Sequence, residues 1–313
     1  MTRAFTFPGQ GSQAVGMGKE LAEAFPAARE VFEEVNEALG QNLSKLMWEG
    51  PGEELTLTEN AQPALMAVSL AAMRVLEKEG GFALADKAAY VAGHSLGEYS
   101  ALAAAGTFTL ADTARLLKTR GQAMQKAVPV GEGAMAAVLG LEFEDAKAVA
   151  EAASEVGVCQ TANDNAPGQV VLSGAKAAVE RAAELAKEKG AKRAMLLDVS
   201  APFHCALMQP AADKMAEALG TVEMRAPSVP LIANVTAGPV DDPETIRKLL
   251  VEQVTGMVRW RESVAWLAEN GVTSVVEVGS GKVLSGLAKR ISKELTAANV
   301  GAPGDVEAFL ASL

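Results

Sequence analysis

The order of strand-like and helical segments is the feature that most constrains the fold of this chain. Short apolar runs at residues 4–7, 89–92, 230–233 and 274–278 are separated by long stretches with helical periodicity. Strands that alternate with helices in this way are typical of a parallel sheet covered by helices. The sequence therefore predicts an α/β protein whose main domain is built on such a sheet.

The rhythm changes between residues 129 and 198. The order in this segment is strand 134–139, helix 143–155, strand 158–161, strand 169–173, helix 175–189 and strand 193–197. This β-α-β-β-α-β order is that of a ferredoxin-like unit. We therefore expect a small ferredoxin-like subdomain at 129–198, inserted into a large α/β domain formed by 1–128 and 199–313. A cleft between the two parts would favour a ligand.

A Gly-x-Ser-x-Gly motif occupies residues 93–97. The apolar run 90–92 precedes it, and helix-forming residues follow from Glu98 onward. In a strand-turn-helix of this kind, the two glycines permit a sharp turn that exposes the serine hydroxyl beside a helix N-terminus. The motif predicts that Ser95 is a nucleophile in acyl transfer.

The base for this serine must be sought among only two histidines, His94 and His204. Neighbouring side chains diverge on a sharp turn, so we expect His94 to pack or hydrogen-bond beside the site. His204 remains as the candidate base, and the alternative is a loop histidine with a structural role. An α/β-hydrolase has its histidine late, after a triad carboxylate, whereas over a hundred residues follow His204. No triad carboxylate can be singled out.

One charge interrupts the apolar face of the helix expected at residues 110–127. When the helix is projected at about 100° per residue, Arg120 is the only charged side chain on that face. A buried guanidinium without a partner is costly. Arg120 therefore meets either a structural carboxylate elsewhere in the fold or a carboxylate of the substrate, which its planar fork can bind. The second alternative predicts an acyl group with a free carboxylate.

Composition limits the remaining function classes. No apolar run approaches 18 residues, and the chain begins with a strand instead of a signal sequence, so we expect a cytoplasmic enzyme without a membrane partner. The formal charge of −11 argues against nucleic acid as a partner. Cys159 and Cys205 are expected to be reduced packing residues. Two histidines without ligand spacing support no metal site.

Two glycine-rich segments resemble nucleotide-binding motifs only in part. Residues 9–14 fit G-x-G-x-x-A, but the segment 27–39 has a helical pattern where a dinucleotide site needs a strand that ends in an acidic residue. Residues 278–282 lack the glycine and Ser/Thr spacing of a P-loop. The first segment is better interpreted as a turn that aims backbone N–H groups at an oxyanion.

Several motifs occur together, in order and from the first strand to the last helix. They are Gly9-Gln10-Gly11-Ser12-Gln13, Ala61-Gln62-Pro63-Ala64-Leu65, Gly93-His94-Ser95-Leu96-Gly97-Glu98-Tyr99, Arg120, Asn165-Ala166-Pro167-Gly168-Gln169, His204, Asn234-Val235 and Glu252-Gln253. With this set the chain resembles the malonyl-CoA:acyl carrier protein transacylase family. The resemblance implies an α/β-hydrolase-like parallel-sheet core with an inserted ferredoxin-like βαββαβ subdomain.

The resemblance also implies a catalytic group, an oxyanion hole and a set of substrate-binding residues. The implied catalytic residues are Ser95, His204 and Gln253. The implied oxyanion hole is formed by Gln10 and Leu96. The implied substrate-binding residues are Arg120, Phe203, His94, Gln62 and Asn165. Ser95 is the implied nucleophile and His204 its base, oriented by the main-chain carbonyl of Gln253. Arg120 is implied to hold a malonyl carboxylate. Phe203, an aromatic residue directly before the histidine, resembles the position that goes with malonyl over methylmalonyl.

The implied reaction is a ping-pong transfer of malonyl from malonyl-CoA to the phosphopantetheine thiol of acyl carrier protein, through a malonyl-serine, for fatty acid synthesis. No cofactor is implied, since the CoA thioester is a substrate. The alternatives are an acyltransferase of a polyketide pathway, a serine thioesterase or hydrolase, and a non-catalytic acyl-binding module. We expect a monomer. The cations that could receive an acidic carrier are Lys192, Arg193, Lys282, Lys289 and Arg290.

Overall fold

The computed structural model describes all residues, 1–313, and contains two sheets. The larger sheet has six strands in the order β10-β9-β1-β2-β7-β8. They are β1 (Arg3–Phe7), β2 (Tyr90–Gly93), β7 (Leu231–Ile232), β8 (Pro239–Val240), β9 (Ser274–Val278) and β10 (Thr296–Val300). Neighbouring strands are parallel except for β7 and β8, which are antiparallel. The α/β class with a parallel core, predicted from the alternation of segments, is confirmed.

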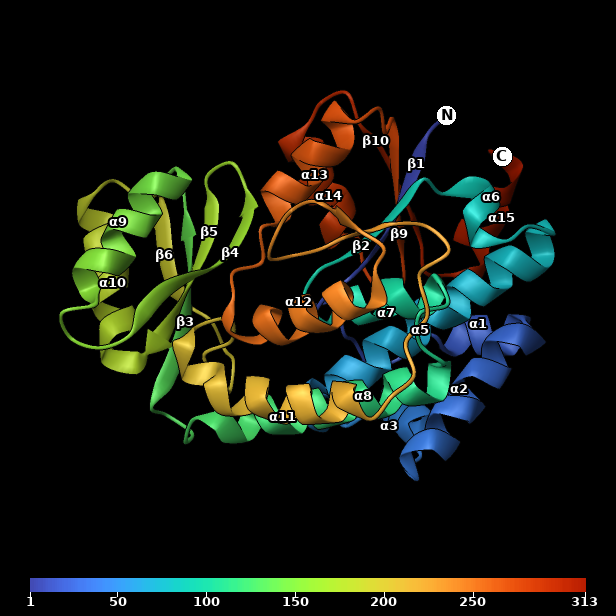
Figure 1. Cartoon of the computed structure of the whole chain (residues 1–313), viewed down its shortest axis with the longest axis horizontal. Helices are drawn as coiled ribbons and strands as arrows, with labels where there is room; N and C mark the ends of the chain where they lie inside the picture. Colours follow the sequence, from blue (N-terminus) through green and yellow to red (C-terminus); the bar gives the residue numbers. More distant parts are fainter.

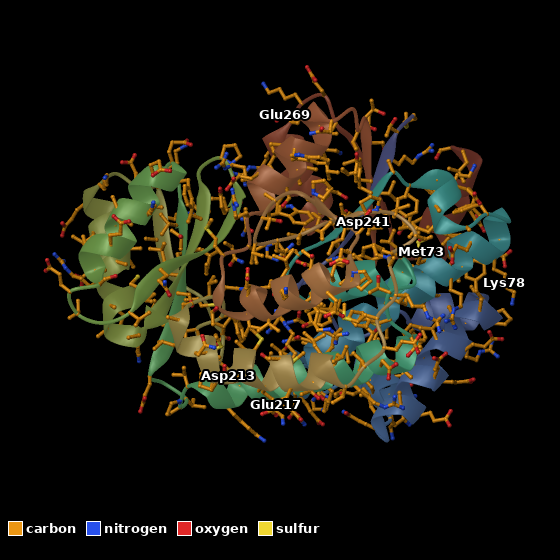
Figure 2. All side chains as sticks on the ribbon, in the orientation of Figure 1. Met73, Lys78, Asp213, Glu217, Asp241 and Glu269 are labelled. Atoms are coloured by element: carbon orange, nitrogen blue, oxygen red, sulfur yellow. The ribbon has the colours of Figure 1, made fainter.

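All helices except the two that pack on the smaller sheet, α9 (Phe143–Ala153) and α10 (Lys176–Glu188), lie around this large sheet (Figure 1). They are α1 (Lys19–Ala24), α2 (Pro26–Leu39), α3 (Leu43–Glu49), α4 (Gly52–Thr56), α5 (Thr58–Gly80), α6 (Leu84–Lys87), α7 (Leu96–Ala104), α8 (Leu110–Ala127), the 3-10 helix η1 (Ala206–Met208), α11 (Gln209–Gly220), α12 (Pro243–Thr255), α13 (Trp260–Glu269), α14 (Val283–Ile291) and α15 (Pro303–Ala311). Helix α11 illustrates the amphipathic pattern: it buries Met215 and Leu219, while Asp213 and Glu217 point outward (Figure 2).

The large sheet separates two apolar clusters, because successive side chains of a strand point to opposite faces. Phe5 and Phe7 of β1 belong to the larger cluster, together with buried side chains of α2, α5, α7 and α8. Ala4 belongs to the cluster on the other face, with Trp260 and Leu267 of α13. The sheet is therefore the middle of three layers, and both of its faces are covered.

The smaller sheet is antiparallel, with four strands in the order β4-β5-β3-β6. Its elements are β3 (Gly133–Leu139), α9 (Phe143–Ala153), β4 (Cys159–Ala166), β5 (Gln169–Ala175), α10 (Lys176–Glu188) and β6 (Arg193–Leu196). The β-α-β-β-α-β order expected for this part of the chain is confirmed, and Figure 1 shows the unit in green at one side of the molecule. The domain boundaries at 129–198 stay a prediction.

Two details differ from the expectations. Strand β4 does not end at residue 161 but continues to Ala166, because the loop-like polar segment Asn163-Asp164-Asn165 pairs with β5 through two register shifts. Such bulges accommodate extra residues within a ladder. Strands β8 and β10 were not predicted. The first has only two residues, and β10 reads Thr-Ala-Ala-Asn-Val at a sheet edge, so neither carries a strong apolar signal.

The carboxyl ends of three neighbouring strands meet at one edge of the large sheet. Strand β1 leads to Gln10, β2 leads to Ser95, and β7 leads to Asn234. Parallel strands bring the loops that follow them to the same edge, where α/β proteins usually build their sites. Residues distant in the chain therefore become neighbours at this edge.

Candidate active site

Ser95 lies in a sharp turn between β2 and α7. Its backbone has φ 53° and ψ −108°, a region that residues with a side chain rarely adopt. A Cβ at Gly93 would overlap the backbone of Gly97, and a Cβ at Gly97 would overlap the carbonyl oxygen of Phe7. Close backbone approach therefore requires both glycines, as expected for an elbow that presents a serine.

His204 contacts Ser95 through one ring nitrogen and the backbone through the other. Its Nε2 lies 2.8 Å from Ser95 Oγ, and its Nδ1 lies 2.8 Å from the carbonyl of Gln253 and 3.1 Å from that of Gly256. Carbonyl oxygens only accept, so Nδ1 carries the proton and Nε2 can accept one from Ser95. Burial, followed by the charge of Arg120, lowers the pKa of His204 to about 3. The imidazole is therefore neutral near pH 7.

Two backbone N–H groups beside Ser95 have no acceptor in the protein. They belong to Gln10, in the turn after β1, and to Leu96, the first residue of α7. Both residues line the same cavity as Ser95. Unpaired N–H groups at this position, one of them at a helix N-terminus, are suited to stabilise an oxyanion.

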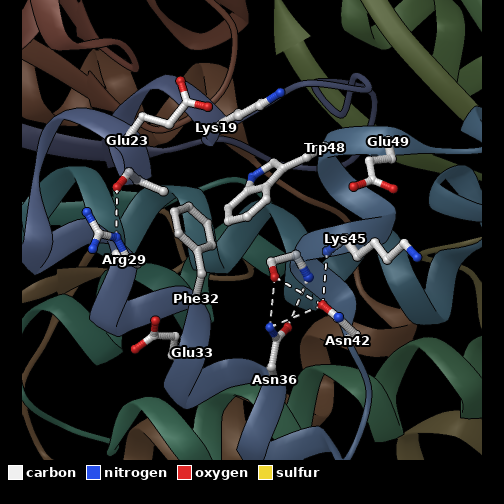
Figure 3. Close-up of a pocket in the computed structure, with 12 residues that line it drawn as sticks. Lys19, Glu23, Arg29, Phe32, Glu33, Asn36, Asn42, Lys45, Trp48 and Glu49 are labelled. Carbon is white, nitrogen blue, oxygen red and sulfur yellow. Dashed lines mark hydrogen bonds between the residues drawn. The ribbon is translucent and has the colours of Figure 1, made fainter.

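These groups line a cavity of about 310 Å³ at the sheet edge. Met124 of α8, Met135 of β3 and Asn163 of β4 complete much of its wall, so both the large and the small sheet contribute to it. A wider depression of about 730 Å³ lies on α1, α2 and α3, around Phe32 and Trp48 (Figure 3). That depression contains none of the site residues predicted from the sequence. The smaller cavity is therefore the candidate active site.

Arg120 borders this cavity although it is only 1% exposed. Its Nη1 donates to Gln62 Oε1 at 2.8 Å, and its Nη2 donates to Gln253 Oε1 at 2.8 Å and to Ser95 Oγ at 3.1 Å. Its Nε has no partner, and the guanidinium lies over the ring of Tyr99 at 5.6 Å. None of these partners is a carboxylate. The structure therefore does not supply the direct structural carboxylate that was one alternative from the sequence.

Two further residues support Ser95, Asn234 by direct contact and Glu98 through its neighbours, and neither was among the predicted site residues. Asn234 accepts the Ser95 N–H at 2.9 Å through Oδ1, and its Nδ2 donates to the carbonyl of Gly93 at 2.7 Å. Glu98 accepts from the Asn234 N–H and from Gln253 Nε2, both at 3.0 Å. Asn234 follows a strand at the same sheet edge as Ser95, which is the signal that could have identified it.

The remaining predicted substrate-binding residues take different positions. Gln62 and Phe203 line the cavity, and Phe203 is 9% exposed. His94 also lines it, and its Nε2 lies 2.8 Å from Oδ1 of Asn165. Asn165 is not on the wall, nor is Gln253, so the structure brings these two to the site through the residues that they contact.

Other expected features concern the molecule outside the cavity. None of the five candidate carrier-docking cations lines the cavity, and one of them, Arg290 of α14, donates to the Pro167 carbonyl at 3.1 Å. No three His, Cys, Asp or Glu side chains gather in a way that could hold a metal ion. No helix is both long and apolar enough to cross a membrane.

Comparison with known proteins shows which family the chain belongs to. The acyl transferase domain family matches residues 4–302, so the chain is an acyl transferase domain protein. The malonyl CoA-acyl carrier protein transacylase of Bacillus subtilis (strain 168) is 48% identical over 311 residues, which cover 99% of this chain and 96% of the relative.

Solved structures agree with this match. An acyl-carrier-protein-S-malonyltransferase from Bartonella henselae superimposes with a TM-score of 0.98 at 60% identity, over 100% of this chain and 99% of the other. A malonyl-transacylase in complex with a type II PKS acyl-carrier protein gives a TM-score of 0.96 at 44% identity, with both chains fully covered. The chain therefore belongs to the malonyl CoA-acyl carrier protein transacylase family, and the resemblance drawn from its motifs is confirmed.

Proposed function

We propose that this protein transfers the malonyl group of malonyl-CoA to the phosphopantetheine thiol of acyl carrier protein, through a malonyl ester of Ser95. The observation that carries the proposal is the meeting of Ser95, a neutral His204 and the guanidinium of Arg120 in one cavity. A nucleophile, a base and a site for an anion are the groups that transfer of a carboxylated acyl group requires. The family membership supports the same activity.

In the first half-reaction, Ser95 Oγ attacks the thioester carbonyl carbon and its proton passes to His204 Nε2, 2.8 Å away. The negative charge that develops on the carbonyl oxygen is stabilised by the N–H groups of Gln10 and Leu96. When the carbon–sulfur bond breaks, the proton moves from His204 to the departing CoA thiolate. Free CoA leaves, and a malonyl-Ser95 ester remains.

The second half-reaction uses the same groups in reverse. The thiol of the carrier gives its proton to His204 and attacks the ester carbonyl, and Ser95 Oγ recovers a proton from His204 as it departs. The Gln253 carbonyl keeps Nδ1 protonated throughout, which replaces the carboxylate of a serine-histidine-aspartate triad in its orienting role. Arg120 holds the malonyl carboxylate in both halves, so the acyl group keeps its position while the thiols exchange.

The pathway and setting follow from the same proposal. We assign the malonyl carrier to fatty acid synthesis, as expected from the sequence. Supply of a polyketide pathway is the second candidate, because a relative of 44% identity is solved with a type II PKS carrier. Cys159 and Cys205 are both free, which supports a reducing compartment, the cytoplasm. We propose a monomer that needs only the CoA thioester and the carrier.

Intact-protein mass spectrometry tests the proposal. Mixing with malonyl-CoA should give one malonyl adduct on the wild type, stable in buffer and discharged only when holo acyl carrier protein is added. The Ser95→Ala variant should give none. Ser100→Ala is the matched control: this buried serine is also in α7 but does not line the cavity, so its adduct should form normally. Discharge by water alone would indicate a hydrolase, and an adduct on Ser95→Ala would refute the mechanism.

A further inference from the structure

A buried carboxyl group, that of Glu98, lies one side chain away from Arg120. The side-chain amide of Gln253 lies between them: Gln253 Oε1 accepts from Arg120 Nη2 at 2.8 Å, and Gln253 Nε2 donates to Glu98 Oε2 at 3.0 Å. The amide therefore has its oxygen toward the cation and its nitrogen toward the anion. Gln253 Nε2 also donates to the Ser95 carbonyl and to Asn234 Oδ1, at 3.0 and 3.2 Å, so the two charges and these neutral acceptors favour the same orientation.

Glu98 is buried where an ionised carboxylate is expensive. It is 1% exposed, in the first turn of α7, and burial raises its pKa to about 7 although Gln253, the Asn234 N–H and Arg120 all favour the charged form. A carboxylate at such a position requires compensation. The same oxygen accepts from Asn234 N and Gln253 Nε2, so both of its contacts lie within the group that surrounds Ser95.

We propose that Glu98 is the resident counter-charge of Arg120, relayed through Gln253, and that it sets how strongly the site holds the carboxylate of the acyl group. The proposal rests on the proposed function, in which Arg120 binds that carboxylate. Glu98 does not touch substrate; it is a positioning residue that acts through Gln253 and Arg120.

The arrangement suits a site that must bind an anion and release it. If a carboxylate of the protein were bound directly to Arg120, the guanidinium N–H groups would not be free to bind the carboxylate of a substrate. With no carboxylate nearby, the buried cation would hold the malonyl group tightly and slow its departure on the carrier. Glu98, one amide away, compensates Arg120 in the empty site and weakens the hold on the second carboxylate in the filled one.

The competing explanation is that Glu98 only accepts hydrogen bonds that hold the elbow. Glu98→Gln separates the two, because an amide oxygen can still accept from Asn234 N and Gln253 Nε2 but the charge is gone. Glu277→Gln is the matched control. Glu277 is also a fully buried carboxylate, and it accepts backbone N–H groups from Leu284 and Ser285 at 3.1 and 2.8 Å, with no arginine contact.

The measurement is kcat/KM for malonyl-CoA and for acetyl-CoA, with holo acyl carrier protein as acceptor. Loss of the counter-charge in Glu98→Gln should raise the malonyl-to-acetyl ratio roughly ten-fold, as expected for two charges coupled through a partly buried network. Glu277→Gln should leave the ratio within about two-fold of the wild type. If both rates fall together in Glu98→Gln and the ratio is unchanged, Glu98 is only an acceptor and the proposal is overturned.

The pH dependence of the wild type supplies a second test, which still holds if the Glu98→Gln variant does not fold. Lowering the pH from 8 to 6 protonates Glu98, whose pKa lies at about 7, and so reproduces the charge loss of Glu98→Gln. The other titratable groups that face it do not change in this range, since burial lowers the pKa of His204 and of His94, burial raises the pKa of Tyr99, and Arg120 stays protonated.

The malonyl-to-acetyl ratio of the wild type should therefore rise as the pH falls, and the ratio of Glu98→Gln should be flat. A flat ratio in the wild type would overturn the proposal. The outcome is distinct from failure of the proposed function, in which the wild type would form no malonyl adduct for the carrier to discharge.

Discussion

Two arginines of this protein differ in their hydrogen-bond partners: Arg261 is paired with a carboxylate, and Arg120 is not. The Nε of Arg261 in α13 donates to both oxygens of Asp164 in β4, at 3.1 and 2.9 Å, and its Nη2 lies 2.8 Å from one of them. Arg120 has two amide oxygens and a hydroxyl instead. A guanidinium paired with a resident carboxylate is part of the framework, whereas one with only neutral partners keeps its affinity for an anion.

The pKa values of the two guanidinium groups move in opposite directions for this reason. The hydrogen bonds that Arg261 donates to Asp164 raise the pKa of Arg261, while burial lowers the pKa of Arg120. Arg261 is also partly exposed, with 33% of its side chain accessible, whereas Arg120 is 1% exposed. A cation that is both less solvated and less neutralised gains more from an incoming carboxylate.

The largest expected effect follows from removing each arginine in turn. Arg120→Ala should lower kcat/KM for malonyl-CoA by about 10³-fold, the range found when one partner of a buried charge pair is truncated. Acetyl transfer should change much less, because an acetyl group has no carboxylate to bind. Steady-state assays with both thioesters give the two values.

Arg261→Ala is the control for this change. It strands the buried carboxylate of Asp164, so the free energy of unfolding should fall by about 1–3 kcal/mol, discounted for the partial exposure of the pair. Among folded molecules the malonyl-to-acetyl ratio should stay at the wild-type value. The comparison fails if Arg261→Ala shifts the ratio as Arg120→Ala does, or if Arg120→Ala lowers both rates equally.

The second largest effect is expected when a carboxylate is placed directly on Arg120, so that its surroundings become like those of Arg261. The double variant Glu98→Gln/Gln253→Glu keeps the net charge but moves the carboxylate onto the position that contacts Arg120 Nη2. The resident pair should then resemble Arg261 with Asp164, and kcat/KM for malonyl-CoA should fall by about 10²-fold. The Gln253 carbonyl that orients His204 is main chain and is retained, but the variant loses the hydrogen bond from Gln253 Nε2 to the Ser95 carbonyl, so the reactivity of Ser95 is measured separately.

A serine-directed sulfonyl fluoride measures that reactivity, since it carries no carboxylate for Arg120 to bind. Its rate of inactivation should fall much less than malonyl transfer in the double variant, because Asn234 still holds the Ser95 N–H and the Gln253 carbonyl still orients His204. Unchanged malonyl transfer would show that Arg120 can bind the substrate carboxylate beside a resident one, and an equal loss of both rates would show that the substitution disturbs the serine or its base.

The sequence could predict Arg120 but not that Gln62 and Gln253, which the resemblance named as site residues, are its partners, and the reason is physical. The periodicity of helix α8 is local, so it reveals that Arg120 shares a face with apolar residues. Its partners Gln62 and Gln253 are separated from it by 58 and 133 positions, and only the fold brings them together. Arg261 gave no signal because Asp164, its partner, lies in a polar segment that reads as a loop. The parallel core followed from alternation, but the short β8 and polar β10 left no pattern.

The third effect is a contrast in pH dependence at His204. Burial, followed by the charge of Arg120, lowers the pKa of this histidine to about 3, below the unperturbed value of about 6.5. A folded pKa below the unfolded one means that the imidazole stays neutral on acidification. The inactivation rate by a neutral sulfonyl fluoride should therefore be nearly constant from pH 7.5 to 5.5, whereas an ordinary histidine would lose about ten-fold.

The same pH profile measured on Arg120→Ala, which lacks the guanidinium charge, is the matched comparison. In Arg120→Ala, burial still acts but the charge does not, so the acid limb of the same profile should move to higher pH. A wild-type profile with its midpoint near 6.5 would contradict this picture, because neither burial nor Arg120 would then be lowering the pKa of His204.

The smallest expected effect concerns the part of the acyl group that Arg120 does not contact. Malonyl and methylmalonyl groups share the carboxylate, so Arg120 treats them alike, and only the wall beside the extra methyl can separate them. Phe203 lines the cavity and directly precedes His204. Phe203→Ser should raise kcat/KM for methylmalonyl-CoA by about ten-fold, the lower end of the range for one methylene group in an apolar pocket. Phe203→Leu keeps an apolar wall and should gain less, and no gain in either variant would remove Phe203 from substrate selection.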